Sequence, residues 1–195
     1  MNNEINAKII LLGDSGVGKT TISNWALTGS FNDQFSPTVG GNYVSKTIQI
    51  NESTIKLQIW DTAGDEKYRS LIPMFFRDAR GAVLVYSIKD RQSFKILDYF
   101  VNSLQDKAPT VFKIVVGNKS DMESERQISS DEGQQYANEI HAQFLETSAK
   151  LGSCIDSLLQ LIAQQVYDTQ TEKASQDQTN NQIKLNEKSG FSCPC

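Results

Sequence analysis

The sequence predicts an α/β fold in which a doubly wound, mostly parallel sheet of six strands carries about five helices on its two faces. Two patterns lead to this prediction. Apolar runs of strand length alternate along the chain with segments whose apolar residues recur at helical spacing. A glycine-rich loop also joins the first apolar run to the first helical segment. With 195 residues, 38% of them hydrophobic, the chain is long enough to bury one substantial core.

The individual elements follow from local signals. The predicted strands lie at 7–12, 43–50, 55–60, 82–86, 111–117 and 143–147. The predicted helices lie at about 19–27, 93–108, 130–139 and 155–167. Because residues 51–54 have turn chemistry, we expect the strands on either side of them to pair as an antiparallel hairpin at one edge of the sheet. The polar stretch 28–42 is long for a loop in a compact domain, which favours a functional role.

One domain is expected at 7–167, between an N-terminal extension at 1–6 and a tail at 168–195. The tail is predicted to be flexible, because it has too few large apolar residues to offset the entropy of ordering it. The net charge of −4 and the absence of basic runs interleaved with aromatic residues argue against nucleic acid as a partner. No apolar stretch approaches the roughly 20 residues of a membrane-spanning helix, so the chain is expected in the cytoplasm. A monomer is expected as well.

Residues 13–20, GDSGVGKT, fit the phosphate-binding pattern G-x-x-x-x-G-K-[ST] between a strand and a helix. Glycines let backbone N–H groups turn inward at the start of the helix, where the helix dipole favours anions. Lys19 is predicted to reach the outer phosphates, and the Thr20 hydroxyl to bind Mg²⁺. The predicted phosphate contacts are Asp14, Ser15, Gly16, Val17, Gly18, Lys19, Thr20 and Thr21. The alternative is a glycine-rich turn that binds nothing, and the segments described next argue against it.

The segment WDTAG, at 60–64, extends this site. Asp61 is predicted to hold Mg²⁺ through water, because ligands bind at the carboxyl ends of the strands in such a sheet. Gly64 has no side chain, so its N–H can approach the γ-phosphate of a nucleoside triphosphate. Taken alone, Asp-x-x-Gly is more often an ordinary turn.

Residues 118–121, NKSD, carry the chemistry of base recognition. The Asp121 carboxylate can accept hydrogen bonds from N1 and the exocyclic amine of guanine, whereas adenine presents an acceptor at N1 and is rejected. Lys119 is expected to lay its aliphatic stem against the base, and Asn118 to tie the loops together. The segment ETSAK supplies the opposite wall, where the Ala149 N–H is predicted to meet guanine O6. The predicted contacts on this wall are Ser148, Ala149 and Lys150.

The ordered motifs GDSGVGKT, PT, WDTAG, NKSD and ETSAK resemble those of the Ras-like small GTPases over residues 8–167. The segments KLQIW and KYRS and two cysteines at the carboxyl end are similar to the Rab branch in particular. The resemblance implies a P-loop NTPase fold, GTP and GDP as ligands, Mg²⁺ as cofactor, and a GTP-hydrolysing switch in vesicle trafficking. An ATP-using P-loop kinase is the alternative, and Asp121 with the wall at 148–150 disfavours it.

The resemblance also assigns roles to single residues. Thr38 becomes the residue whose hydroxyl binds Mg²⁺ and whose amide senses the γ-phosphate, and Phe31 is placed near the guanine. The implied effector-binding residues are Tyr43, Trp60 and Tyr68. The implied catalytic residues are Lys19, Thr38, Gly64 and Asp65. The implied Mg²⁺ ligands are Thr20, Thr38 and, through water, Asp61.

Asp65 departs from the family pattern, which has at this position a Gln that orients the attacking water. An Asp side chain is one methylene shorter, donates no hydrogen bond when ionised, and brings negative charge toward the polyphosphate. Slow intrinsic hydrolysis is therefore expected, although activating proteins of the Rab branch contribute an arginine and a glutamine in trans. The alternative is a GTP-binding scaffold with little or no hydrolysis that recruits effectors. Gly41 is a second departure, since the family carries a β-branched residue there.

Cys193 and Cys195 match the Cys-x-Cys prenylation signal of the Rab branch and not the C-a-a-X pattern. Because two prenyl chains anchor a protein far better than one, the resemblance implies reversible attachment to the cytosolic face of an endomembrane. The segments at 70–73 and 77–78 are similar to those of a Golgi-associated Rab subgroup. The implied protein partners are effectors, an exchange factor, an activating protein, a prenylation escort protein and a GDP-dissociation inhibitor.

Overall fold

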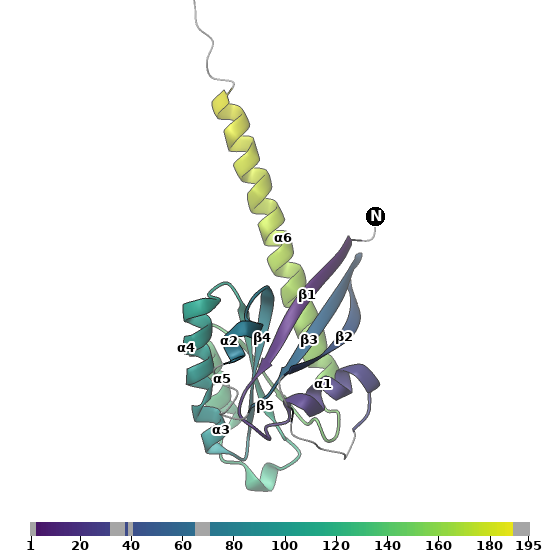
Figure 1. The fold of residues 1–195 in the computed structure, drawn as a ribbon, viewed down its shortest axis with the longest axis vertical. Coiled ribbons are helices and arrows are strands. Elements are labelled where there is room, and N and C mark those ends of the chain that lie inside the picture. Colours follow the sequence, from purple (N-terminus) through teal and green to yellow (C-terminus); the bar gives the residue numbers. More distant parts are fainter. Residues whose placement is uncertain (1–2, 32–37, 39–40, 65–70, 189–195) are drawn as a thin grey trace, which may run out of the picture.

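The predicted α/β fold is confirmed by a computed structural model, which describes residues 3–31, 38, 41–64 and 71–188 (Figure 1). A six-stranded sheet with the order β2-β3-β1-β4-β5-β6 forms its centre. Among the strands of the described residues, only β2 and β3 pair in antiparallel fashion, as the predicted edge hairpin, and all other neighbouring strands are parallel. The strands are β1 (Asn3–Leu12), β2 (Gly41–Ile50), β3 (Ser53–Thr62), β4 (Ala79–Ser87), β5 (Phe112–Asn118) and β6 (Gln143–Thr147).

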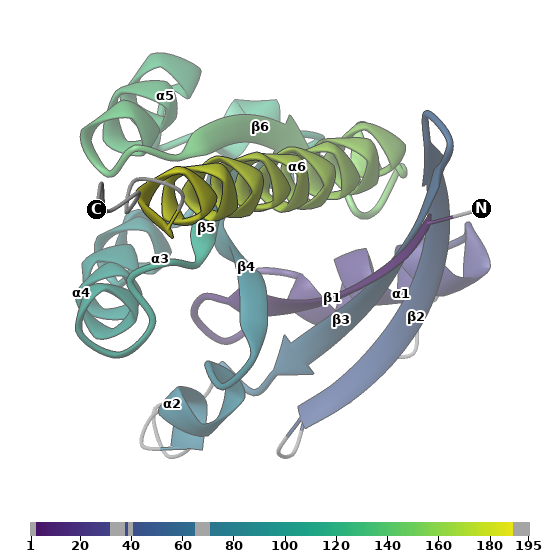
Figure 2. The same cartoon turned by 90° about the horizontal axis from the view of Figure 1, so that it is seen from above.

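Helices cover both faces of this sheet, as Figure 2 shows from above. The helices are α1 (Lys19–Thr28), α2 (Ile72–Phe75), α3 (Arg91–Lys95), α4 (Leu97–Lys107), α5 (Ser130–Glu139) and α6 (Ile155–Lys188), with a 3₁₀ turn at Glu123–Glu125. Successive residues of β1 point to opposite faces of the sheet and contribute in turn to two hydrophobic cores. Ile9 and Leu11 face the core under α1 and α6, whereas Ile10 and Leu12 face the core under α2, α4 and α5.

The helix predicted at 93–108 is two helices, α3 and α4, joined at Ile96. The first begins earlier than expected because the Asp90 carboxylate caps it, accepting hydrogen bonds from the N–H groups of Gln92 and Ser93. Ser129 caps α5 in the same way, which fixes its start at Ser130 as predicted. The short helix α2 was not predicted, because four residues are too few to show a helical period.

Both ends of the described chain are more regular than expected. β1 begins at Asn3, so most of the predicted N-terminal extension belongs to the sheet, where Ile5 is buried and pairs with Ile55. Helix α6 runs to Lys188, through most of the segment predicted to be a flexible tail, and projects beyond the rest of the domain (Figure 1). No Pro or Gly occurs within α6, and Gln, Lys, Glu and Ala are good helix formers. Among the described helices, none has the length and apolar character that crossing a membrane requires.

Candidate functional site

The phosphate-binding loop lies at the carboxyl end of β1 and leads directly into α1. Gly13 has φ of 149°, and a Cβ there would collide with the carbonyl oxygen of Val85 on β4. Gly18, at the N-cap of α1, has φ of 103°, and a Cβ there would collide with the Asn118 side chain. Both positions therefore require glycine. In the described chain, no side chain caps the start of α1, which leaves this end of the helix suited to an external anion.

Lys19 supplies the positive charge of this loop. Its side chain is buried and curls back, so that Nζ donates to the carbonyl oxygens of Gly13 at 2.9 Å and Asp14 at 2.7 Å. Burial lowers the pKa of Lys19 to about 8, against the opposing effect of the nearby Asp61 and Asp14 carboxylates. The ammonium group is thus held over the loop, where it can exchange carbonyl oxygens for phosphate oxygens.

Three oxygen-bearing side chains meet beside Lys19, and they come from three separate parts of the chain. The Thr20 hydroxyl donates to Asp61 Oδ2 at 2.6 Å, and the Thr38 hydroxyl lies 2.8 Å from that of Thr20 and 3.3 Å from Asp61 Oδ2. Hydroxyl and carboxylate oxygens are the hard ligands that Mg²⁺ prefers.

One oxygen of Asp61 still lacks a hydrogen-bond partner. Its Oδ1 atom is buried and has no hydrogen-bond partner among the described residues. Burial raises the pKa of Asp61, while hydrogen bonds from Thr20 and Thr38 and the charge of Lys19 act in the opposite direction. A buried carboxylate oxygen without a partner is costly, and a cation with its bound water satisfies it. The predicted Mg²⁺ ligands therefore fit this ion by position and by chemistry.

Gly64 closes the site on the side of β3. A Cβ at this residue would lie 2.5 Å from Lys19 Nζ and 2.5 Å from the carbonyl oxygen of Asp14. The backbone at 64 thus lies directly against the ammonium group and the phosphate-binding loop. The sequence predicts that the N–H of this residue approaches the outer phosphate, and that contact stays a prediction.

Asn118 joins the predicted base-binding loops to the phosphate-binding loop. Its Nδ2 atom donates to the Val17 carbonyl at 2.8 Å, and its Oδ1 atom accepts from Thr147 Oγ1 and from the Ala149 N–H, each at 3.1 Å. The side chain is buried, so all of these bonds are shielded from water. The Ala149 N–H predicted for guanine O6 therefore has a protein partner in this structure.

The remaining base-binding residues lie around the same point. Ser148 Oγ donates to Asp121 Oδ1 at 2.5 Å, which orients the carboxylate. Lys119 Nζ donates to the Gly16 carbonyl at 2.6 Å, which joins the NKSD segment to the phosphate-binding loop. Burial, and to a smaller extent the charge of Lys89, lowers the pKa of Lys119. Lys150 is exposed at the rim. The predicted phosphate-binding, Mg²⁺-binding and base-binding residues thus lie next to one another along the carboxyl ends of β1, β3, β5 and β6.

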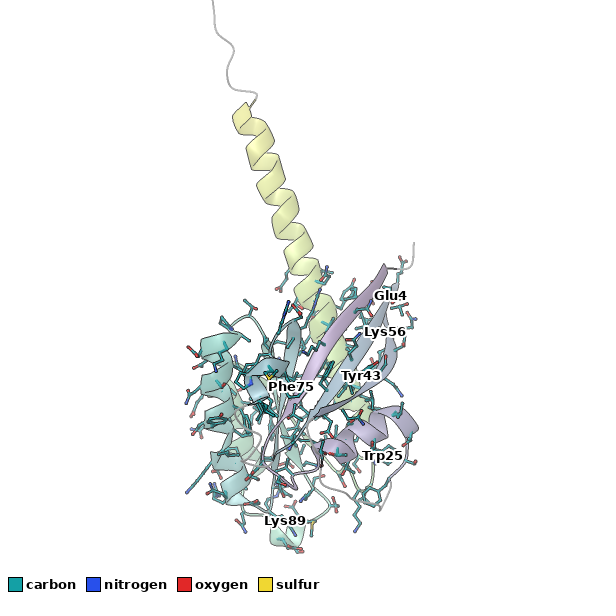
Figure 3. All side chains as sticks on the ribbon, viewed as in Figure 1. Glu4, Trp25, Tyr43, Lys56, Phe75 and Lys89 are labelled. Carbon is teal, nitrogen blue, oxygen red and sulfur yellow. The ribbon has the colours of Figure 1, made fainter. Side chains whose placement is uncertain are left out.

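A cluster of aromatic rings lies outside this site, next to α2. Tyr43, which is 56% exposed, stacks on Trp60 with ring centres 5.3 Å apart, and Phe75 packs on Trp60 at 6.0 Å (Figure 3). Lys8 Nζ lies 4.9 Å from the centre of the Trp60 ring. The Phe75 ring occupies the space that a side chain at Gly41 would need, since a Cβ there would lie 2.7 Å from it. Sequence reasoning missed Phe75, because no motif includes it and its contact with Trp60 forms only in the folded chain.

Some of the predicted residues lie outside the described part of the chain. These are Asp65, Tyr68, Cys193 and Cys195. Phe31 is described and half-buried. Sequence reasoning also gave no role to Trp25 or Arg126. The Trp25 indole N–H donates to the Ala149 carbonyl. Arg126 pairs with Glu146, the first residue of the ETSAK segment. No motif marks either residue, and only the folded chain reveals their contacts.

Comparison with known proteins agrees with this geometry. The sequence model of the Ras family matches residues 8–168. The chain is 37% identical over 194 residues to the Ras-related protein RabC of Dictyostelium discoideum, covering 97% of this chain and 99% of RabC. It is 38% identical over 174 residues to the GTP-binding protein ypt2 of Schizosaccharomyces pombe, covering 87% of each chain.

The matched region contains every motif of the site, from the phosphate-binding loop to the wall after β6. The sheet order and the single antiparallel pair are those expected for a Ras-like P-loop fold. We conclude that the chain belongs to the Ras family and is a GTPase of its Rab branch.

Proposed function

We propose that this GTPase is a membrane-associated GTP/GDP switch that regulates vesicle trafficking on the cytosolic face of an endomembrane. The observation that carries the proposal is the contact network of Asn118, which ties the phosphate-binding loop to both base-binding loops. A site connected in this way responds as a unit to the nucleotide that it holds. Membership in the Rab branch supports the trafficking role.

Guanine selectivity is assigned to Asp121 and Ser148. The hydrogen bond from Ser148 Oγ leaves the carboxylate of Asp121 as an acceptor for the N1 and exocyclic amine donors of guanine. Adenine offers an acceptor at N1, so it would leave the carboxylate without a partner. We expect GDP to bind at least 10³-fold more tightly than ADP, because a site built for hydrogen bonds strongly rejects an analogue that lacks them. In Asp121→Asn the preference should move toward xanthine nucleotides, whose C2 carbonyl accepts from the amide.

The hydrolytic roles are assigned to residues around Lys19. Lys19 holds the outer phosphates, Thr20, Thr38 and Asp61 hold Mg²⁺, and the Gly64 N–H contacts the γ-phosphate. Bound by these residues, Mg²⁺ would neutralise the negative charge that develops on the phosphates. Thr38 lies between α1 and β2 in the chain, and loss of the γ-phosphate would remove the contact that its amide makes in the GTP state. That release is the proposed difference between the GTP and GDP states.

Asp65 is proposed to slow the intrinsic reaction. It follows Gly64 in the chain, and the carboxylates of Asp61 and Asp14 already act on Lys19. A further negative charge at 65 opposes the approach of the polyphosphate. The carboxylate also cannot orient water as the amide of Gln does, because it donates no hydrogen bond. The shorter side chain adds to this effect.

Single-turnover hydrolysis of preloaded GTP by the full chain tests this assignment. Asp65→Gln restores both length and amide, whereas Asp65→Asn removes only the charge. We expect the order of rates to be Gln above Asn above the native chain. If the native chain is a working switch, an activating domain that supplies an arginine and a glutamine in trans should make it hydrolyse GTP fast. Equal rates for all three chains would refute the role of Asp65.

A GTP-binding scaffold is the second candidate function, and Asp65 is the feature that favours it. If neither Asp65→Gln nor the activating domain produces phosphate release while GTP stays bound, the scaffold becomes the better interpretation. In both cases the bound state would present a surface to effectors. We assign that surface to Tyr43, Trp60 and Tyr68, and we add Phe75, which packs on Trp60.

Membrane attachment is assigned to Cys193 and Cys195. Helix α6 extends through most of the tail, so it would hold the domain at a distance from the membrane. We expect a chain treated with prenyltransferase and escort protein to float with neutral lipid vesicles. The double variant Cys193→Ser/Cys195→Ser should remain unbound, and single variants would show whether both cysteines are needed. Equal flotation of the double variant would refute this assignment.

A further inference from the structure

Trp25 lies on α1 (Figure 3), outside the phosphate-binding and base-binding motifs. It nevertheless donates a hydrogen bond to Ala149, in the wall that follows β6. We propose that Trp25 is a positioning residue for the guanine base, which holds residues 148–152 in place and thereby slows nucleotide release. The inference rests on the guanine site proposed above and extends it to a residue that only the folded chain brings there. It predicts a defined kinetic effect for a side chain that no motif includes.

The first observation is the fixed orientation of Ala149. The Trp25 indole N–H donates to the Ala149 carbonyl oxygen at 2.5 Å, while the Ala149 N–H donates to Asn118 Oδ1 at 3.1 Å. Ala149 is only 3% exposed. Both backbone polar groups of this residue are therefore engaged, one by α1 and the other by β5. Removal of the indole N–H would leave a largely buried carbonyl without its partner.

The second observation is the packing of the indole ring against Gly152. This glycine has φ of 75°, and a Cβ there would lie closer than 3.0 Å to three atoms of the Trp25 ring. The ring thus occupies the space that the side chain of any other residue at 152 would need. Trp25 is half-buried and also packs against the core under α1 and α6.

The contacts of residues 148–153 carry the effect of Trp25 to Asp121. Ser148 Oγ donates to Asp121 Oδ1 at 2.5 Å and accepts from the Leu151 N–H at 3.1 Å. The Ser148 N–H donates to the Ser153 carbonyl at 3.1 Å, which closes the segment into a small ring of hydrogen bonds. Displacement of 149 and 152 would therefore move Ser148, and with it the carboxylate that reads the base.

The same helix begins at the phosphate-binding residues. Trp25 follows Lys19 by six positions, which is about 9 Å along a helix. Helix α1 is thus a short rigid connection between the phosphate end of the nucleotide and the wall around its base. Loss of the Trp25 contact is expected to weaken the hold on the base while leaving the phosphate and Mg²⁺ contacts intact.

The test compares nucleotide release from the full chain and its variants. Trp25→Phe keeps a ring but removes the N–H, and Trp25→Leu removes both. Tyr136→Phe is the matched control, because it keeps its ring and loses one side-chain hydrogen bond, to Asp98 at 2.9 Å, between helices on the other face of the sheet. The release rate of a fluorescent GDP analogue is measured with Mg²⁺ and after chelation, together with the melting temperature and the preference for GDP over IDP.

We expect Trp25→Phe to release GDP about threefold to tenfold faster, as the loss of one net hydrogen bond implies, and Trp25→Leu to release it faster still. The preference for GDP over IDP should fall, because IDP lacks the exocyclic amine that Asp121 recognises. The acceleration caused by chelation should be the same in all chains. Tyr136→Phe should release GDP within about twofold of the native rate.

The proposal is overturned if both Trp25 variants release GDP at the native rate, or if they keep the native preference for GDP over IDP. It is also overturned if Tyr136→Phe accelerates release as much as Trp25→Phe does, since the effect would then be general destabilisation. Failure of the guanine site itself is recognised separately. In that case Asp121→Asn would leave the preference for guanine over xanthine nucleotides unchanged, whatever the Trp25 variants do.

Discussion

Replacement of Asn118 by alanine tests whether one buried side chain holds the nucleotide site together. The change removes hydrogen bonds of 2.8, 3.1 and 3.1 Å to Val17, Thr147 and Ala149. At about 1 kcal/mol net for each bond, the free energy of unfolding should fall by about 3 kcal/mol. For a domain of this size that corresponds to a loss of about 6 to 12 °C in melting temperature.

Thermal unfolding of the nucleotide-free chain is the appropriate assay, because a bound nucleotide adds its own stabilisation. Thr147→Val provides the graded control, since it removes only one of the three bonds and should lower the melting temperature by about 2 to 4 °C. The release rate of GDP should rise in the same order. If Asn118→Ala is no more destabilising than Thr147→Val, the bonds to Val17 and Ala149 contribute nothing and the reasoning is refuted.

Three further predictions concern the phosphate end of the site. Asp61→Asn should raise the Mg²⁺ concentration needed to slow GDP release by about 10- to 100-fold, and an unchanged midpoint would exclude Asp61 from the metal site. Burial lowers the pKa of Lys19 to about 8 in the nucleotide-free chain, whereas the phosphates of bound GDP raise it. Because GDP binding therefore takes up a proton, GDP affinity should fall as the pH rises through about 8. Lys19→Arg, which stays charged, should flatten that profile. Gly64→Ala should lower GTP affinity relative to GDP at least tenfold, because its Cβ would lie 2.5 Å from Lys19 Nζ; an unchanged ratio contradicts the close approach.

The pKa of Lys19 also has a consequence for folding. In the nucleotide-free chain the folded-state pKa of about 8 lies below the ordinary value of 10.5. Between these values the unfolded chain binds more protons than the folded one, so the free energy of unfolding contributed by this group rises with pH in that window. Urea unfolding at several pH values between 8 and 10.5, with Lys19→Met as the comparison, measures this contribution.

Most of the fold was predictable because its signals are local. Strands such as Gln143–Thr147 and helices such as Ser130–Glu139 were predicted to the residue, since their apolar pattern and the Ser129 cap lie in contiguous sequence. The break at Ile96, the short helix α2 and the early start of β1 were not predicted. Each depends on a cap, a turn or a neighbouring strand that no periodic pattern reveals.

By itself, the sequence determined the chemistry of the site, because each motif joins its functional groups within a few residues and residue type fixes what an oxygen, an ammonium group or a bare backbone can bind. The tertiary structure alone decided which of these groups meet. The parallel register brings Asn118 to Thr147 and Ala149, and the packing of α1 brings Trp25 to Ala149 and Gly152. The hydrogen bond between Trp25 and Ala149 joins residues 124 positions apart, and that between Asn118 and Val17 joins residues 101 positions apart. They arise from strand order and helix packing, which are properties of the whole chain and not of any segment of it.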